Sequence, residues 1–150
     1  MLYTVAQGAD LLNALQGRWK PVYQEVDGQM VPPAESATTV VELQGNEFKV
    51  EKKGVVEYDG FFTIDALTSP MEISLIYKKS SKDIFLGGPR PGVFQLEGDT
   101  LKWCFGPLGL PRPKGLNTFP GSESVLSIYQ KDPTKVKGAA TSLFRGGIVW

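Results

Sequence analysis

Hydrophobic and polar residues alternate in short runs along most of the chain. The runs WKPVYQEV, TTVVEL, EFKVEK and MEISLIYK show this alternation, and GVFQLEG, TLKWCF and SVLSIYQ share their β-branched and aromatic residues. A period of two residues is typical of strands that bury one face. Turn sequences separate the runs, and they include Asp27-Gly28, Gly45-Asn46, Lys53-Gly54, Gly98-Asp99 and Pro120-Gly121. The pattern predicts eight or nine short antiparallel strands.

An all-β chain of this kind can form a sandwich or a barrel. A meander closed into an eight-stranded antiparallel barrel removes the exposed edges and encloses room for side chains or one small ligand. We therefore expect a single all-β barrel domain over residues 1–150, with the barrel at about 17–131 and a C-terminal extension at 132–150. The segment GADLLNALQG places Leu11, Leu12 and Leu15 on one face of a short N-terminal helix.

The charge balance bears on the class of partner. Sixteen basic and sixteen acidic residues give a formal net charge of zero, and no block of five like charges occurs. We therefore expect no nucleic-acid partner and no polybasic membrane patch. No segment approaches the about 20 apolar residues of a membrane span, and the first residues lack the pattern of a signal peptide. These features predict a cytoplasmic protein.

The chain has no His and a single Cys. This composition excludes an intramolecular disulfide, a Ser-His-Asp or Cys-His catalytic site, and a metal held by His or by several Cys. We expect no metal and no cofactor. If Trp103 and Phe105 point into the barrel, Cys104 between them points outward. Without a His as its base, Cys104 is expected to be a wall residue rather than a nucleophile.

Three longer blocks share an order with a known family. They are LQGRWKPVYQEVDGQMVPPAE, GFFTIDALTSPMEISLIY and GVFQLEGDTLKWCFGPLGLPRPKGLNTFPGSESVLSIYQKD. Together they resemble a family of small bacterial domains of uncharacterised function that abound in planctomycetes, with the pattern Leu-Gln-Gly-x-Trp, Gly-Asp-Thr-Leu-Lys-x-Cys-Phe and a Pro-Arg-Pro loop. The resemblance covers about residues 15–132. It implies a lipocalin-like (calycin) barrel and no particular activity.

The resemblance also implies how one end of the barrel is closed. Gly17 and Trp19 are similar to the Gly-x-Trp of lipocalins, in which the Trp closes one end and a basic residue near the end of the last strand covers it. Lys131 is the nearest match for this basic residue, and Arg145 in the tail is the alternative. The chain departs from lipocalins in lacking their disulfide, and from the bacterial family in carrying the long tail.

Aromatic residues fall in several of the expected strands, and alternation can direct many of them to one interior. The same residues can fill a solid core or wall an apolar pocket that offers a few hydroxyl groups. Arg90 in GGPRPG and Arg112 in GLPRPKG lie in Pro-restricted loops, where each could bind a ligand carboxylate. The candidate ligand-binding residues are Tyr23, Tyr58, Phe62, Tyr77, Arg90, Phe94, Trp103, Phe105, Arg112 and Tyr129.

Three functions fit these features. The first is binding of a small hydrophobic or amphipathic molecule inside the barrel. The second is an isomerase or cyclase that needs neither His nor a metal. Its acid or base would be Tyr77, Asp59, or Glu25, which alternation places on the face of Trp19. The third is an interaction module with a filled barrel, whose C-terminal tail or Pro-rich loops bind a protein partner. The sequence itself identifies no catalytic residue.

Overall fold

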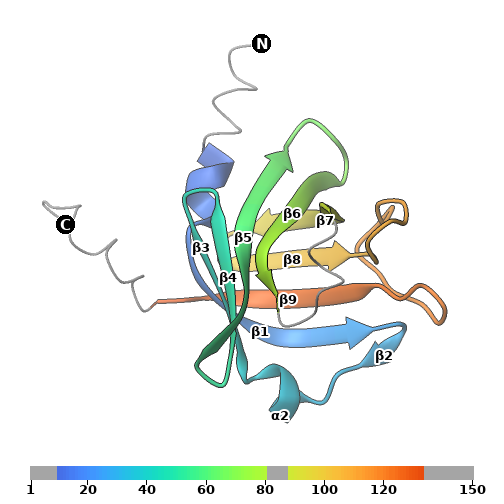
Figure 1. The fold of residues 1–150 in the computed structure, drawn as a ribbon, viewed down its shortest axis with the longest axis horizontal. Coiled ribbons are helices and arrows are strands. Elements are labelled where there is room, and N and C mark those ends of the chain that lie inside the picture. Colours follow the sequence, from blue (N-terminus) through green and yellow to red (C-terminus); the bar gives the residue numbers. More distant parts are fainter. Residues whose placement is uncertain (1–9, 81–87, 134–150) are drawn as a thin grey trace, which may run out of the picture.

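Eight strands pair in chain order and close into a barrel in the computed structural model, which describes residues 10–80 and 88–133 (Figure 1). The strands are β1 (Gly17–Val26), β3 (Thr39–Gln44), β4 (Glu47–Lys52), β5 (Val55–Asp65), β6 (Met71–Ser80), β7 (Arg90–Glu97), β8 (Thr100–Phe105) and β9 (Val125–Asp132). Each strand pairs antiparallel with the next one in the barrel, and β1 pairs with β9. The predicted eight-stranded antiparallel barrel is confirmed, and its closure leaves no edge in the ring.

A short ninth strand and a short helix lie beside the barrel. Strand β2 (Gln29–Met30) folds back on the end of β1, and helix α2 (Pro33–Ser36) leads from it to β3. The turn between β1 and β2 has Asp27 and Gly28 at φ values of 52° and 83°. Two successive positive φ angles favour a two-residue hairpin turn whose twist matches that of the flanking strands. The turn predicted at Asp27-Gly28 is therefore confirmed.

A bulge in β1 changes which side chains face the lumen. The pairing of β1 with β9 shifts at Val22, whose side chain is 62% exposed. Trp19, before the bulge, points into the core, and beyond the bulge Gln24 points into the lumen while Glu25 points outward. The expectation that Glu25 shares the face of Trp19 is therefore wrong, because one extra residue reverses the alternation.

A dense core fills the barrel at the end where β1 begins. The predicted N-terminal helix is confirmed over residues 10–15, and it packs Leu15 against this core. Trp19 is fully buried there, and its Nε1 donates a hydrogen bond of 2.9 Å to the carbonyl oxygen of Leu15. Lys131 lies with its Nζ 5.0 Å from the centre of the Trp19 ring, as the resemblance to lipocalins implies. This end of the barrel is solid.

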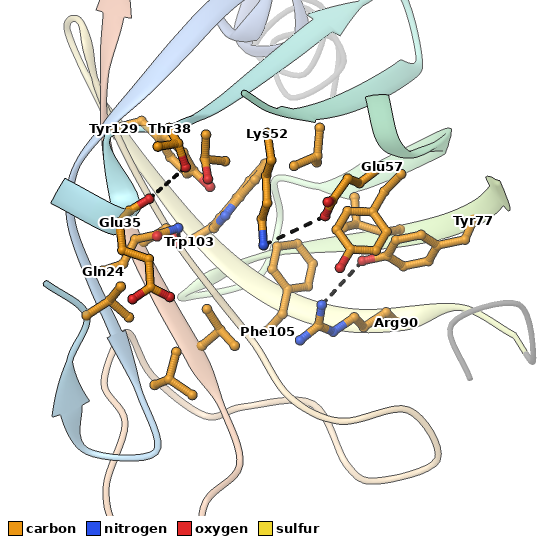
Figure 2. Close-up of a pocket in the computed structure, with 18 of the residues that line it drawn as sticks. Gln24, Glu35, Thr38, Lys52, Glu57, Tyr77, Arg90, Trp103, Phe105 and Tyr129 are labelled. Carbon is orange, nitrogen blue, oxygen red and sulfur yellow. Dashed lines mark hydrogen bonds and ion pairs between the residues drawn. The ribbon is translucent and has the colours of Figure 1, made fainter. Parts of the chain in front are cut away.

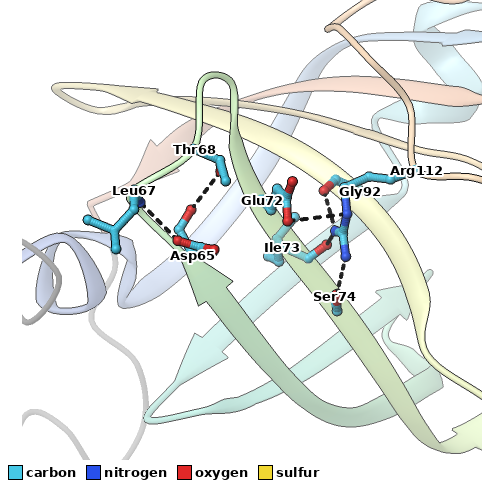
Figure 3. A network of polar contacts seen from close by, with 8 residues as sticks. All are labelled: Asp65, Leu67, Thr68, Glu72, Ile73, Ser74, Gly92 and Arg112. Atoms are coloured by element: carbon cyan, nitrogen blue, oxygen red, sulfur yellow. Dashed lines mark hydrogen bonds and ion pairs between the residues drawn. The ribbon is translucent and has the colours of Figure 1, made fainter.

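The long loop at residues 106–124 folds over the outer surface of the barrel. Arg112 in this loop donates from Nη1 to the carbonyl oxygens of Ile73 and Gly92, both at 2.8 Å, and from Nη2 to Ser74 at 3.0 Å (Figure 3). Its Nε lies 3.5 Å from a carboxylate oxygen of Glu72. The arginine therefore fastens the loop to β6 and β7 from outside, where it satisfies two strand carbonyls.

Cys104 lies under this loop. It packs with Val93 and Leu126 on the outer face of the barrel and is fully buried. Its Sγ is 3.6 Å from the carbonyl oxygen of Asn117, and burial raises the pKa of the thiol. The prediction of a wall residue that points away from the lumen is confirmed. A buried thiol with a raised pKa is a poor nucleophile.

The C-terminal extension falls largely outside the described residues. Strand β9 runs to Asp132, so the barrel ends one residue beyond the predicted boundary. Residues 134–150, including Arg145, lie outside the described part of the chain, and the expected protein partner of the tail stays a prediction. Within residues 10–80 and 88–133, no helix has the length and apolar character needed to cross a membrane.

Candidate functional site

The barrel contains a cavity of about 620 Å³ at the end opposite the solid core. Pockets that hold small molecules measure roughly 300–1,000 Å³. The wall is built from strands of the barrel, and the segment from Val31 to Thr38, with α2, borders the mouth (Figure 2). A cavity of this size distinguishes the barrel from one that is filled throughout by its own side chains.

Three aromatic rings form a continuous wall along the cavity. Trp103 contacts Phe105 on one side and Tyr129 on the other, each with a distance of 5.2 Å between ring centres and a nearly perpendicular arrangement. Strand alternation places all three on the inner face, since Trp103 and Phe105 are two residues apart on β8 and Tyr129 pairs with Leu101 on the same strand. These rings, which we call the aromatic ladder, offer a continuous apolar surface to a ligand.

A cationic group stands at the mouth end of this ladder. The guanidinium carbon of Arg90 is 5.6 Å from the centre of the Phe105 ring. Arg90 donates from Nε to the carbonyl oxygen of Gly106 at 3.0 Å and from Nη1 to the hydroxyl of Tyr77 at 3.3 Å. The two bonds hold the guanidinium in one orientation, and Tyr58 packs edge-on against Tyr77 at 5.9 Å. Burial raises the pKa of Tyr77, so its hydroxyl keeps its proton at neutral pH.

A neutral polar cluster lies deeper in the lumen. Gln24 donates from Nε2 to the hydroxyl of buried Ser127 at 3.1 Å. Burial raises the pKa of Tyr129 to about 12, while hydrogen-bonding contacts with Ser127, Trp103 and Gln24 act in the opposite direction. Hydroxyl and amide groups can both donate and accept hydrogen bonds. The cluster therefore places uncharged donors and acceptors on an otherwise apolar wall.

Charged side chains line the rim. Lys52 Nζ lies 3.8 Å from Glu57 Oε1, and the Lys52 side chain is 47% exposed. An exposed ion pair contributes only about 0–1 kcal/mol to stability. Glu35 and Lys53 also border the opening. The rim is polar and partly exposed, whereas the interior is mainly apolar.

The structure brings six of the ten predicted ligand-binding residues to the cavity wall. They are Tyr58, Tyr77, Arg90, Trp103, Phe105 and Tyr129. Phe62 and Phe94 belong to the barrel core and do not line the cavity, and Tyr23 points outward, where its hydroxyl donates to Glu25 at 2.7 Å. Arg112 is on the outer surface as well. Arg90 and Arg112 therefore do not bind one ligand carboxylate together, because Arg112 is bonded to strand carbonyls.

The three acid–base candidates likewise differ in whether they line the cavity. Glu25 lies outside the lumen, where hydrogen bonds from Thr118 and Tyr23 lower the pKa of its carboxyl group. Asp59 does not line the cavity either, and its Oδ1 is buried without a hydrogen-bond partner among the described residues. Tyr77 is the one of the three that lines the cavity.

Sequence reasoning missed several polar residues of the lumen and its rim. Gln24 was hidden by the bulge, which simple alternation does not reveal. Ser127 could have been found, because VLSIYQ places a small polar residue on the same face as Tyr129. Lys52 is the last residue of β4, and Glu57 lies where the register between β4 and β5 shifts, so simple alternation does not decide its orientation.

Within the described ranges no three His, Cys, Asp or Glu side chains gather as ligands of a metal ion would. Comparisons of the chain with protein-family models, curated proteins and solved structures give no match.

Proposed function

We propose that this protein binds a small, mainly hydrophobic molecule in the barrel lumen. The observation that carries the proposal is the cavity of about 620 Å³ lined by the aromatic ladder, in a barrel whose other end is solid. The expected lipocalin-like relationship, based on residues 15–132, supports the same function, because barrels of this size can hold one small ligand. A fold by itself does not specify a function, whereas a cavity of this size is a direct feature of a binding site.

The energetics favour an apolar ligand. Burial of apolar surface contributes roughly 25 cal/mol per Å². The rings of Trp103, Phe105 and Tyr129 are held against one another and need little ordering when a ligand arrives. A preformed apolar wall of this kind supplies affinity, and the few polar groups supply orientation.

Isomerase or cyclase activity is the second candidate, and one observation favours it. The Tyr77 hydroxyl lies in the lumen 3.3 Å from Arg90 Nη1, so a protonated phenol and a cation face the same ligand. Such a pair could polarise a carbonyl group while the barrel holds a flexible substrate in one conformation. Conversion of the bound molecule on incubation, lost in Tyr77→Phe, would support this candidate over simple binding.

The first experiment is native mass spectrometry of the protein purified from the organism that makes it. A bound small mass that disappears on denaturation is the expected result. The second measurement follows tryptophan fluorescence during titration with methyl decanoate, an uncharged apolar probe, because Trp103 lines the cavity. We expect saturable binding.

A matched pair of variants locates the probe. Val50→Phe places a ring in the cavity, whereas Val22→Phe places one on the exposed outer face. We expect Val50→Phe to weaken binding at least about tenfold and Val22→Phe to leave it unchanged, with circular dichroism showing that both fold. Absence of a bound mass together with equal behaviour of the two variants would refute binding in the lumen.

A further inference from the structure

The polar groups of the cavity are gathered in two places. Arg90 and Tyr77 form a cationic site, and Gln24, Ser127 and Tyr129 form a neutral site. In Figure 2 the labelled Tyr77 and Arg90 lie on one side of the cavity, Gln24 and Tyr129 lie on the other, and Phe105 lies between them. The cavity therefore offers different chemistry to the two ends of one ligand.

The strand register gives the order of these sites along the barrel. Gly92 pairs with Phe105, and Trp103 pairs with Ser127. Arg90 is two residues toward the mouth from Gly92, and Trp103 is two residues deeper than Phe105. The backbone at Arg90 and the backbone at Ser127 thus differ by four residues in level, or roughly 13 Å at the rise of a strand.

The aromatic ladder spans the distance between the sites. The Arg90 guanidinium lies over the ring of Phe105, which is the residue of the ladder nearest the mouth. Tyr129, at the deep end of the ladder, belongs to the neutral site. Trp103 stands between them and touches both rings. An apolar body that lies along these three rings would therefore reach from one polar site to the other.

Arg90 is a better anion site than Lys52, a lysine at the rim of the same cavity. The Lys52 side chain is largely exposed and is paired with Glu57 at 3.8 Å. The Arg90 residue is partly buried, and its guanidinium is oriented by the Gly106 carbonyl and lies against an aromatic ring. A charge-assisted hydrogen bond is shorter and stronger than a neutral one, and a low local dielectric strengthens it further.

We propose that the ligand is an elongated amphipathic anion with polar groups at both ends. Its carboxylate or comparable anionic group binds Arg90 and Tyr77, its apolar body lies on the aromatic ladder, and a neutral hydroxyl or carbonyl at the far end bonds with Ser127 and Gln24. This inference rests on the proposed binding function and specifies its ligand class. An extended ten-carbon chain has a length comparable to the roughly 13 Å between the backbone levels of Arg90 and Ser127.

Four probes of equal chain length test the two sites separately. They are 10-hydroxydecanoic acid, decanoic acid, methyl 10-hydroxydecanoate and methyl decanoate, each titrated into the full chain while tryptophan fluorescence is followed. We expect the free acids to bind about 10- to 100-fold more tightly than their methyl esters. The hydroxyl should add about threefold to tenfold in either background. These comparisons need no change in the protein.

Two variants assign the effects to residues. Arg90→Met should remove the preference for the acids and leave the affinity for both esters within about twofold. Ser127→Ala should remove the advantage of the hydroxylated probes and leave the acid preference intact. Lys20→Met, which removes an exposed cation on the outer face, is the control and should change neither.

The outcomes separate this inference from the binding function itself. Equal affinity for all four probes, with weakening only by Val50→Phe, would overturn the two-site ligand class and keep the lumen as an apolar pocket. An acid preference that survives Arg90→Met would also overturn it, because the anion would then bind elsewhere. Failure of every probe to bind, in parent and variants alike, would remove both the function and the inference.

Discussion

The two ends of the barrel use the same contact for different purposes. At the solid end Lys131 lies 5.0 Å from the Trp19 ring, and at the open end Arg90 lies 5.6 Å from the Phe105 ring. Lys131 also donates to the carbonyl oxygen of Ala14 at 3.0 Å and so ties the N-terminal helix over the ring. Arg90 donates to Gly106 in the wall and lines the cavity.

The difference shows that an end is closed by the segment that packs over it, and not by the cation that lies over the aromatic ring. Helical residues 10–15 bring Leu15 onto Trp19 and complete a core. At the other end α2 reaches only the rim of the cavity. Stability and the proposed binding therefore depend on opposite ends of one sheet, and substitutions at each end should affect different measurements.

The largest effect is expected at the solid end. Trp19→Ala removes a fully buried indole and its hydrogen bond to Leu15, and should lower the free energy of unfolding by about 3–5 kcal/mol. Urea denaturation measures this loss. Trp19→Phe keeps part of the packing and should cost clearly less. A loss below about 1 kcal/mol for the alanine variant would show that the two ends do not differ in this way.

The second effect tests whether the outer face of the barrel near the open end is closed to solvent. Cys104 is on the outer face near the open end, covered by the loop at 106–124, with a raised pKa caused by burial. Its reaction with a thiol reagent should be about 100-fold slower or more in the native protein than in urea. Rapid reaction of the folded protein would mean that the loop does not cover this wall.

A smaller effect separates the two cations. Lys131→Met should lower stability by roughly 1 kcal/mol through loss of the ring contact and the Ala14 bond. It should leave the affinity for decanoic acid unchanged. Arg90→Met, in contrast, should lower the affinity for decanoic acid. The two variants are compared by urea denaturation and by fluorescence titration, and identical patterns would remove the distinction between the ends.

Most of the architecture followed from simple rules. Alternation of polar and apolar residues predicted the strands, Asp-Gly and Gly-Asn pairs predicted turns, and closure of a meander predicted the barrel. These rules work because a strand with one buried face repeats every two residues. The helix over the solid end was equally readable from Leu11, Leu12 and Leu15.

The candidate site was only partly predictable, and the two Pro-Arg-Pro segments show why. Arg90 and Arg112 have the same neighbours, yet one faces the lumen and the other fastens a loop to outer strand carbonyls. Local sequence restricts the backbone but does not fix which side of the sheet a loop covers. The bulge at Val22 hid Gln24 for a related reason, since one extra residue reverses every later assignment.

The smallest expected effect is a loss of stability at low pH that is confined to the open end of the barrel. Hydrogen bonds from Thr118 and Tyr23 lower the pKa of Glu25 below its ordinary value of 4.5. A lowered pKa in the folded state means that the ionised carboxyl stabilises the fold above this value. The contribution is lost as the pH falls through the lowered pKa. The effect should be below about 1 kcal/mol, because solvent screens the group.

Glu25→Gln should remove this part of the acid sensitivity, since the amide does not titrate. Amide hydrogen exchange below pH 4.5 should show earlier opening of the loop around Thr118 than of the backbone around Trp19 in the parent protein. In the variant, the two regions should keep a constant ratio of protection over the same pH range. Equal acid sensitivity at both ends of the parent would mean that Glu25 does not anchor the loop, and that the solid and open ends loosen together.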